Sequence, residues 1–161
     1  MRSSSPLRPA GRRTNVWTSM DTYDQTTALP AAEVATARAP RILVIDDDRY
    51  VRTLLCDLLE AWGYEADAAA DGREGLARFS PGRYDAVLTD LGMAGITGLD
   101  VIAGVRERDR EVSVIMFTAF TGDLEPQGRR LGFTVLRKPL EIEGLRRALR
   151  AALLARGTMA G

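Results

Sequence analysis

The sequence contains no histidine and only one cysteine among its 161 residues. Without histidine the chain cannot supply a Ser-His-Asp triad, a histidine-ligated zinc ion or a phosphohistidine of its own. Because Cys56 has no second cysteine to pair with, an intrachain disulfide and a thiolate-rich metal site are excluded as well. Any chemistry of this chain must therefore depend on carboxylates, hydroxyls and lysine.

The chain also lacks long hydrophobic stretches and a strong excess of charge of one sign. No apolar run approaches the roughly 18 residues that a membrane-spanning helix needs, and the first residues do not have the apolar core of a secretory signal. Net charge is zero, with five basic and three acidic residues in positions 1–40 and 17 basic and 19 acidic residues in positions 41–161. We therefore expect a cytoplasmic protein that contacts neither a membrane nor nucleic acid directly.

Residues 1–40 are rich in Ser, Pro, Ala, Thr and Arg and show no hydrophobic periodicity, so we predict a disordered N-terminal tail. Within it, residues 1–20 contain four arginines and no acidic residue, a composition shared by transit peptides. A solvated tail, or a true start at Met20, explains the same composition. The remaining length supports one domain, which we place at residues 41–157, followed by a short C-terminal tail at residues 158–161.

Segments typical of strands and helices alternate five times in this domain. Short apolar runs bounded by turn residues predict four of the strands, a weak alternation of apolar and polar residues predicts the strand at 64–69, and apolar residues at three- and four-residue spacing predict helices. The expected strands span 42–45, 64–69, 84–89, 112–117 and 133–136. The expected helices span 50–62, 74–79, 99–108, 123–131 and 141–156. Gly63 and Gly157 suit the ends of the first and last helices. This alternation predicts an α/β fold with a doubly wound parallel sheet, in which the second strand is peripheral and the other four are buried.

Polar residues follow the four strands that we expect to be buried. The first ends in Asp46–Asp48, the third in Asp90, the fourth in Thr118 and the fifth is followed by Lys138. Because the carboxyl ends of parallel strands meet at one edge of the sheet, where ligands bind in open α/β folds, these side chains should converge. Neighbouring carboxylates repel one another and favour a bound cation, whereas a hydroxyl and an ammonium group suit phosphoryl oxygens.

The stretches that carry these residues closely resemble the receiver domain of bacterial response regulators. The matching stretches read Ile-Leu-Val-Ile-Asp-Asp-Asp, Leu-Thr-Asp-Leu-Gly-Met-x-Gly, Met-Phe-Thr-Ala and Arg-Lys-Pro. The resemblance covers about residues 41–157 and implies a flavodoxin-like, five-stranded (βα)5 sheet of order 2-1-3-4-5. It also implies a single-domain phosphorelay protein that accepts a phosphoryl group from a partner's phosphohistidine, with Mg²⁺ as cofactor.

The resemblance assigns roles to the acidic residues. Asp90 would be the phosphoacceptor and would also contact the metal. Asp47 would bind Mg²⁺ directly, Asp46 would act partly through water, and the backbone oxygen of Gly92 would be a further ligand. Asp48 has no role in this scheme, and we interpret it as the N-cap of the first helix.

The resemblance also assigns the residues that would hold the phosphoryl group. Thr118, the adjacent Ala119 and Lys138 would form the phosphoryl-binding and switch positions. The peptide bond between Lys138 and Pro139 would be cis, a form largely confined to bonds that precede proline. Val135 departs from the family, because many members have an aromatic side chain at this position that moves with the threonine.

A second departure lies in the expected helix at 123–131. It contains Pro126 and Gly128, which are poor residues inside a helix. The interval between Thr118 and Lys138 is also shorter than in the family. We expect this helix to be weak and to change its order when the protein is phosphorylated.

The resemblance further implies that the start of the helix at 50–62 receives the histidine-bearing helices of a histidine kinase or a histidine phosphotransfer protein. Tyr50, Val51 and Leu54 are the candidate contact residues, although Val51 and Leu54 could equally belong to the core. Output would then pass to an unknown downstream protein by docking.

Two other functions compete with this hypothesis. A haloacid-dehalogenase-like phosphatase also uses an aspartate nucleophile, a threonine, a lysine and Mg²⁺, but it needs an acidic pair on a strand after the lysine. Here Glu141 and Glu143 open a helix instead. A receiver fold used only as a binding module would not need all of the polar positions. We therefore expect a signalling protein that catalyses only its own phosphorylation and dephosphorylation.

Overall fold

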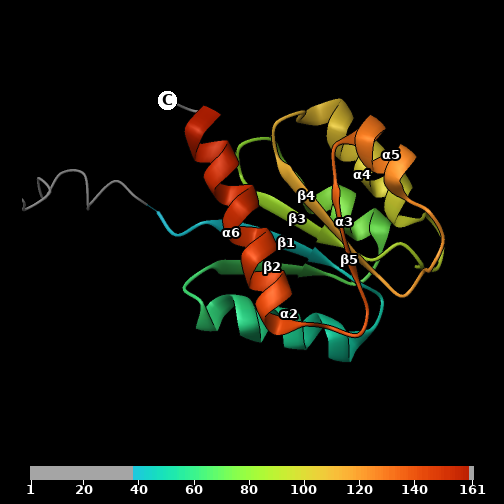
Figure 1. Cartoon of the computed structure of the whole chain (residues 1–161), viewed down its shortest axis with the longest axis horizontal. Coiled ribbons are helices and arrows are strands. Elements are labelled where there is room, and N and C mark those ends of the chain that lie inside the picture. Colours follow the sequence, from blue (N-terminus) through green and yellow to red (C-terminus); the bar gives the residue numbers. More distant parts are fainter. Residues whose placement is uncertain (1–37, 160–161) are drawn as a thin grey trace, which may run out of the picture. The chain divides into compact units, whose positions relative to one another are not determined.

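Five parallel strands form one sheet of order β2-β1-β3-β4-β5 in the computed structural model, which describes residues 38–159 (Figure 1). The strands are β1 (Arg41–Ile45), β2 (Glu65–Ala69), β3 (Ala86–Thr89), β4 (Ser113–Thr118) and β5 (Thr134–Arg137). The helices are α2 (Arg49–Ala61), α3 (Gly72–Arg78), α4 (Gly98–Arg108), α5 (Glu125–Leu131) and α6 (Ile142–Met159). Each expected strand and helix is present, and the flavodoxin-like strand order is confirmed.

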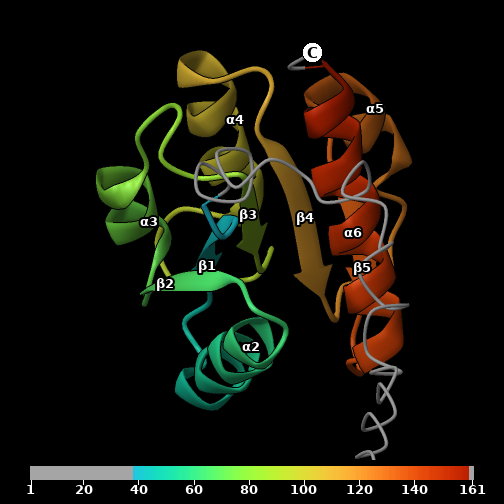
Figure 2. The same cartoon turned by 90° about the vertical axis from the view of Figure 1, so that its left-hand side faces the viewer.

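Helices cover both faces of the sheet, with α2 and α6 on one face and α3, α4 and α5 on the other (Figures 1 and 2). Successive side chains of β1 alternate between these layers. Leu43 and Ile45 pack in the layer of α3 and α4, whereas Ile42 and Val44 pack in the layer of α2 and α6. All four are at most 1% exposed, and burial of such side chains contributes roughly 1.5–3 kcal/mol each. The strand that leads to the acidic residues is therefore firmly held from both faces.

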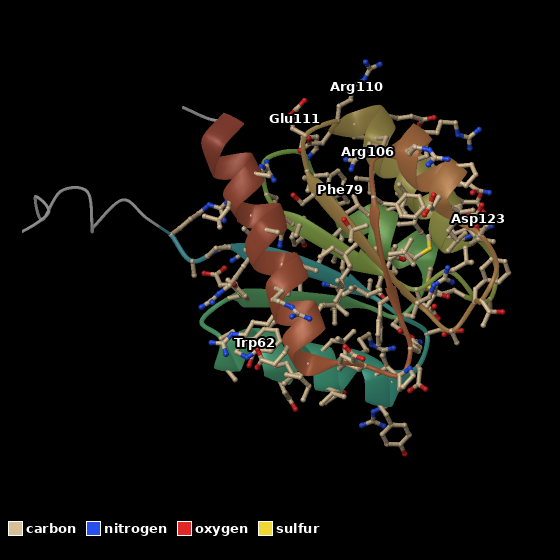
Figure 3. All side chains as sticks on the ribbon, in the orientation of Figure 1. Trp62, Phe79, Arg106, Arg110, Glu111 and Asp123 are labelled. Carbon is tan, nitrogen blue, oxygen red and sulfur yellow. The ribbon has the colours of Figure 1, made fainter. Side chains whose placement is uncertain are left out.

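Helix α2 packs against the sheet and α6 through Leu55 and Leu59, which are buried. Trp62 at its C-terminal end is half-buried against the same layer (Figure 3). The Arg146 guanidinium lies 5.7 Å from the centroid of the indole ring. Gly63 follows with a φ of 85°, a conformation that favours glycine, so its predicted role at the helix end is confirmed.

Two expectations about the last third of the domain are wrong. Strand β5 is not buried, because it pairs only with β4 and forms an edge, with Thr134 and Arg137 exposed and the two residues between them half-buried. Gly157 does not end the last helix, which continues to Met159. Glycine inside a helix costs only about 1 kcal/mol relative to alanine, which a long packed helix tolerates.

The predicted N-terminal tail lies largely outside the described residues, which exclude positions 1–37, and residues 160 and 161 of the predicted C-terminal tail lie outside them as well. Within residues 38–159, none of the helices is both long enough and apolar enough to cross a membrane.

Helix α4 begins where the chain passes very close to the end of β3. A Cβ atom on Gly98 would lie 2.1 Å from the backbone oxygen of Asp90, and the Gly98 N–H donates to the Leu91 carbonyl at 3.0 Å. Thr97 caps the helix: its hydroxyl accepts from the Asp100 N–H, and the Asp100 carboxylate accepts from the Thr97 N–H at 2.9 Å. The close approach of Gly98 to Asp90 needs a glycine at position 98, because a side chain there would collide with the Asp90 backbone.

Helix α5 begins without a side-chain cap from its own N-cap residue, Leu124, and the Asp123 carboxylate accepts from the Glu125 N–H at 2.9 Å instead. None of its seven residues, all within the described part of the chain, is buried. It begins two residues later than expected, which places Pro126 in the first turn, where the missing N–H has no helical partner to lose. Its C-terminal end is better held, because Arg106 of α4 donates to the carbonyls of Leu131 at 2.6 Å and Gly132 at 2.7 Å (Figure 3).

Replacement of the glycine at the start of α4 should destabilise the domain. We expect Gly98→Ala to lower the free energy of unfolding in urea by about 1–3 kcal/mol, because the new methyl group displaces the backbone at Asp90. Gly157→Ala is the matched control: a Cβ there meets nothing within 4 Å, so it should leave stability unchanged or raise it by up to about 1 kcal/mol. Equal stability of Gly98→Ala and the parent would show that the segment between Asp90 and Gly98 can shift to accommodate the methyl group.

The two seven-residue helices should differ in how readily their first turns open. In α3 the Gly75 N–H donates to the Asp71 carbonyl at 3.0 Å and the N-cap residue Asp71 bonds the Glu74 N–H. In α5 the Gly128 N–H donates to the Leu124 carbonyl at 2.8 Å, the N-cap residue Leu124 makes no side-chain bond, and Asp123 outside the helix bonds only the Glu125 N–H. Native-state hydrogen exchange should give Gly128 at least about tenfold less protection than Gly75, or ~1.4 kcal/mol in opening free energy. Equal protection would mean that the missing cap does not weaken α5.

Candidate functional site

The loop between β1 and α2 is held by its own side chains. The Asp46 N–H donates to the Ala69 carbonyl at 3.2 Å, and the Asp46 carboxylate accepts from the Asp48 N–H at 2.9 Å. The Asp48 carboxylate accepts from the N–H groups of Tyr50 at 2.8 Å and Val51 at 3.2 Å. Asp48 is therefore the N-cap of α2, as predicted, and its carboxylate is turned to the helix.

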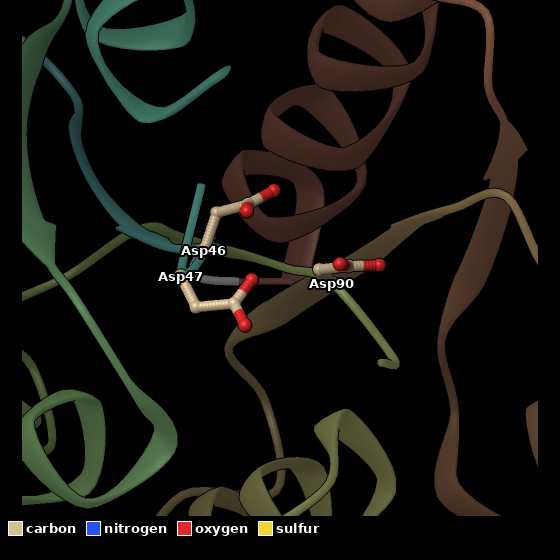
Figure 4. Close-up of side chains that lie close together, drawn as sticks. All are labelled: Asp46, Asp47 and Asp90. Atoms are coloured by element: carbon tan, nitrogen blue, oxygen red, sulfur yellow. The ribbon is translucent and has the colours of Figure 1, made fainter. Parts of the chain in front are cut away.

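Three carboxylates converge at the carboxyl edge of the sheet (Figure 4). Asp46 and Asp47 come from the end of β1 and Asp90 from the end of β3, and one oxygen of each lies within 4.8 Å of the others. The exposed fraction is 2% for Asp46 and 12% for the side chain of Asp90, whereas Asp47 is exposed to solvent. This set offers only oxygen atoms, the ligands that hard divalent cations prefer.

Lys138 provides the positive charge of the site. Its Nζ lies 3.6 Å from a carboxylate oxygen of Asp46 and 3.6 Å from one of Asp90, and 5.2 Å from the centroid of the Phe117 ring. Burial raises the pKa of the Asp46 carboxyl, and the charges of Asp90 and Asp47 add to this, whereas the Asp48 N–H and Lys138 oppose it. Lys138 therefore pairs with two of the three carboxylates, Asp46 and Asp90, and a second cation would relieve the repulsion among all three.

Thr118 lies at the end of β4 and is 2% exposed. Its hydroxyl oxygen accepts from the Phe120 N–H at 3.1 Å, and its carbonyl accepts from the Lys138 N–H at 2.9 Å, which ties the ends of β4 and β5 together. The Lys138-Pro139 bond is cis, as the resemblance implied. Ala119 is exposed in the loop that follows Thr118.

The remaining predicted positions lie at the margins of the site. Gly92 is exposed two residues after Asp90, and a Cβ there would meet nothing within 4 Å. Tyr50 and Leu54 are 85% and 47% exposed on α2, whereas Val51 is half-buried against the core of the α2 layer. Of the two alternatives for these residues, Leu54 is at the surface and Val51 contributes to the core.

Val135 stands where many members of the family have an aromatic side chain, and an open hollow lies beside it. Val135 is half-buried, and together with Leu124, Phe133 and Arg137 it lines an open hollow of about 550 Å³ next to α5. Arg137 donates to the carbonyls of Phe120 and, at 2.9 Å, Gly122, and so holds the loop after Thr118.

Two residues that shape this site escaped the sequence-based prediction. Gly98 allows α4 to start against the backbone of Asp90, and a glycine that opens a capped helix was its only signal in the sequence. Arg52 of α2 donates to the carbonyl of Asp46 at 2.7 Å, and nothing in its sequence context distinguished it from a solvated arginine.

The chain matches a family model described as the response regulator receiver domain over residues 42–150. It is 31% identical over 116 residues to sporulation initiation phosphotransferase F of Bacillus subtilis, covering 70% of this chain and 93% of that protein. It is 38% identical over 87 residues to the CAI-1 autoinducer sensor kinase/phosphatase CqsS of Vibrio cholerae, which is 54% of this chain but only 13% of the kinase.

A solved structure agrees with these matches. The response regulator protein TrrA of Thermotoga maritima, in complex with Mg(2+)-BeF, superposes with a TM-score of 0.66 at 32% identity, covering 71% of this chain and 99% of that one. Both the sequence and the fold thus point the same way, and the chain belongs to the receiver domain family of two-component response regulators.

Proposed function

We propose that this chain accepts a phosphoryl group on Asp90 from a phosphohistidine of a partner protein, in a reaction that needs Mg²⁺. The observation that carries this proposal is the convergence of three carboxylates within 4.8 Å with Lys138, which lies 3.6 Å from two of them. The family supports the direction of transfer, because receiver domains receive phosphoryl groups from histidine kinases or phosphotransfer proteins.

The acidic residues fit Mg²⁺ in both donor type and charge. Asp47 and Asp90, the carbonyl of Gly92 and, partly through water, Asp46 would hold the ion, which retains several waters in sites of this kind. Bound Mg²⁺ would supply positive charge to the transferring phosphoryl oxygens. The TrrA structure contains Mg(2+)-BeF, which supports the choice of ion.

Asp90, Lys138 and Thr118 would each have a separate role in the transfer. A carboxylate oxygen of Asp90 attacks phosphorus, the P–N bond to the partner's imidazole breaks, and the imidazole leaves with the bonding electrons and takes up a proton. Lys138 already lies beside Asp90 and would follow the negative charge onto the phosphoryl group. The Thr118 oxygen accepts a hydrogen bond from Phe120, so its own hydroxyl hydrogen remains available for a phosphoryl oxygen.

We propose further that the protein signals by docking, in the cytoplasm, through a receiver domain at residues 41–157. Tyr50 and Leu54 are exposed apolar side chains beside the acidic edge, which suits contact with the phosphodonor. The weakly held start of α5 suits a region whose order follows the state of Asp90, with the output passing to an unknown downstream protein. Because the family consists of signalling phosphoacceptors rather than ordinary enzymes, the phosphatase alternative loses support.

Loss of the exposed acid should abolish phosphorylation without harming the fold. We expect Asp47→Ala to slow labelling of the chain by phosphoramidate at least about 100-fold, while thermal stability without Mg²⁺ stays equal or rises because charge repulsion is relieved. Asp90→Asn should remove the label entirely. Intact-mass spectrometry over time, with and without Mg²⁺, measures both effects.

The control for this experiment is Asp57→Ala, which removes an exposed acid from α2 outside the cluster and should label like the parent. Unchanged, Mg²⁺-dependent labelling of Asp47→Ala would remove Asp47 from the metal site. A parent that takes up no label, but releases phosphate continuously from a phosphomonoester, would instead be a phosphatase. A parent that does neither would be a binding module.

The exposed face of α2 should affect only transfer from a protein donor. We expect Leu54→Ala to slow transfer from a phosphorylated histidine phosphotransfer protein about tenfold, because a buried apolar contact at an interface is lost, and to leave labelling by phosphoramidate unchanged. Leu154→Ala is the matched control, since Leu154 is 71% exposed on α6. Equal loss with both donors would contradict docking through Leu54.

A further inference from the structure

Arg52 lies one turn into α2 and reaches back over the loop that carries the acidic residues. Side chains on a helix point toward its N-terminus, so a residue at this place covers the turn before it. The half-buried Arg52 guanidinium donates through Nη1 to the carbonyl of Asp46 at 2.7 Å, and the same nitrogen lies 3.5 Å from the carbonyl of Asp47. Both acceptors belong to residues whose carboxylates converge with Asp90.

These contacts fix the loop from the side of the helix. The other hydrogen bonds of Asp46 hold its N–H to Ala69 and its carboxylate to the Asp48 N–H. Arg52 adds a donor for its carbonyl, so the peptide units after Asp46 and Asp47 are oriented toward α2. With the carbonyls held on that side, both side chains leave the loop toward Asp90.

Arg52 contacts the backbone of the acidic loop, at the carbonyls of Asp46 and Asp47. These bonds to carbonyls do not engage the carboxylate oxygens of Asp46 and Asp47. An arginine aimed at the carboxylates themselves would compete with the metal.

We propose that Arg52 is a positioning residue of the metal site: it holds the peptide groups of Asp46 and Asp47 so that their carboxylates keep the geometry that Mg²⁺ requires. This inference depends on the proposed function. Mg²⁺ demands nearly ideal octahedral geometry, so small displacements of its ligands reduce affinity. Outer partners that orient metal ligands typically contribute 10- to 100-fold to affinity, and we place Arg52 near the lower end because it acts through carbonyls.

The test compares two arginines, Arg52 and Arg156, which lie at opposite ends of the domain and each donate to a backbone carbonyl. Arg52→Met removes the bond to Asp46, and Arg52→Lys restores a donor and a charge. Arg156→Met is the matched control, because the half-buried Arg156 of α6 donates to the Tyr84 carbonyl at 2.6 Å, just before β3 begins. Mg²⁺ is titrated into each full-length chain and followed by NMR through the amide shifts of Asp47 and Asp90, and thermal stability is measured without Mg²⁺.

We expect Arg52→Met to raise the Kd for Mg²⁺ about tenfold and Arg52→Lys to recover most of this loss. Arg156→Met should lower thermal stability and leave the Kd unchanged. The inference is overturned if the Kd of Arg52→Met stays within about twofold of the parent, or if Arg156→Met loses as much Mg²⁺ affinity. Should the methionine variant not fold, Arg52→Gln takes its place, because it keeps a polar side chain at this half-buried position, and a Kd within about twofold of the parent then overturns the inference. A parent chain without any Mg²⁺-dependent shift contradicts the proposed function instead.

Discussion

Repulsion among Asp46, Asp47 and Asp90 is the constraint on which the rest of this domain depends. Two unit charges about 4 Å apart near a protein surface interact by about 4 kcal/mol, while a whole domain is stable by only about 5–15 kcal/mol. Here one oxygen of each of three carboxylates lies within 4.8 Å of the others, and the one ammonium group beside them, that of Lys138, pairs with Asp46 and Asp90. The fold resists this repulsion by burying β1 on both faces and by holding the acidic loop with backbone and side-chain hydrogen bonds. A cation bound between the three carboxylates would attract each of them and so offset their mutual repulsion.

The groups of the site come from parts of the sheet that differ in firmness. Asp46 and Asp90 follow the buried strands β1 and β3, whereas Lys138 follows β5, a partly exposed edge beside the weakly capped α5. The acids are therefore attached to central strands that are buried on both faces, and the ammonium group is attached to an exposed edge strand. Under the proposed function, a change of charge at Asp90 would therefore displace Lys138 and β5 more readily than β1 and β3.

Sequence alone predicted the parts of this structure that depend on local pattern. Short apolar runs and one weak alternation identified the strands, and polar residues after four of them identified members of the site, because parallel strands end at one edge. Strand β5 was misjudged because the predicted stretch 133–136, Phe-Thr-Val-Leu, was weighed by its apolar residues rather than by its place at the end of the strand order. The roles of Gly98 and Arg52 were not predictable in this way, since they arise from contacts with the backbone at Asp90 and Asp46 that only the folded chain brings together.

The exposed position of β5 has a consequence for the behaviour of the protein at high concentration. An edge strand presents unpaired backbone groups that can join the sheet of another molecule, which is a common route to aggregation. Strand β5 is only four residues long, and it ends in Arg137, followed by Lys138 and a proline that has no N–H to donate. Positive charge, short length and proline are the means by which natural sheets prevent such pairing. The charged residues and the proline at the end of β5 thus disfavour pairing with another sheet, and a substitution that removes charge there should lower solubility.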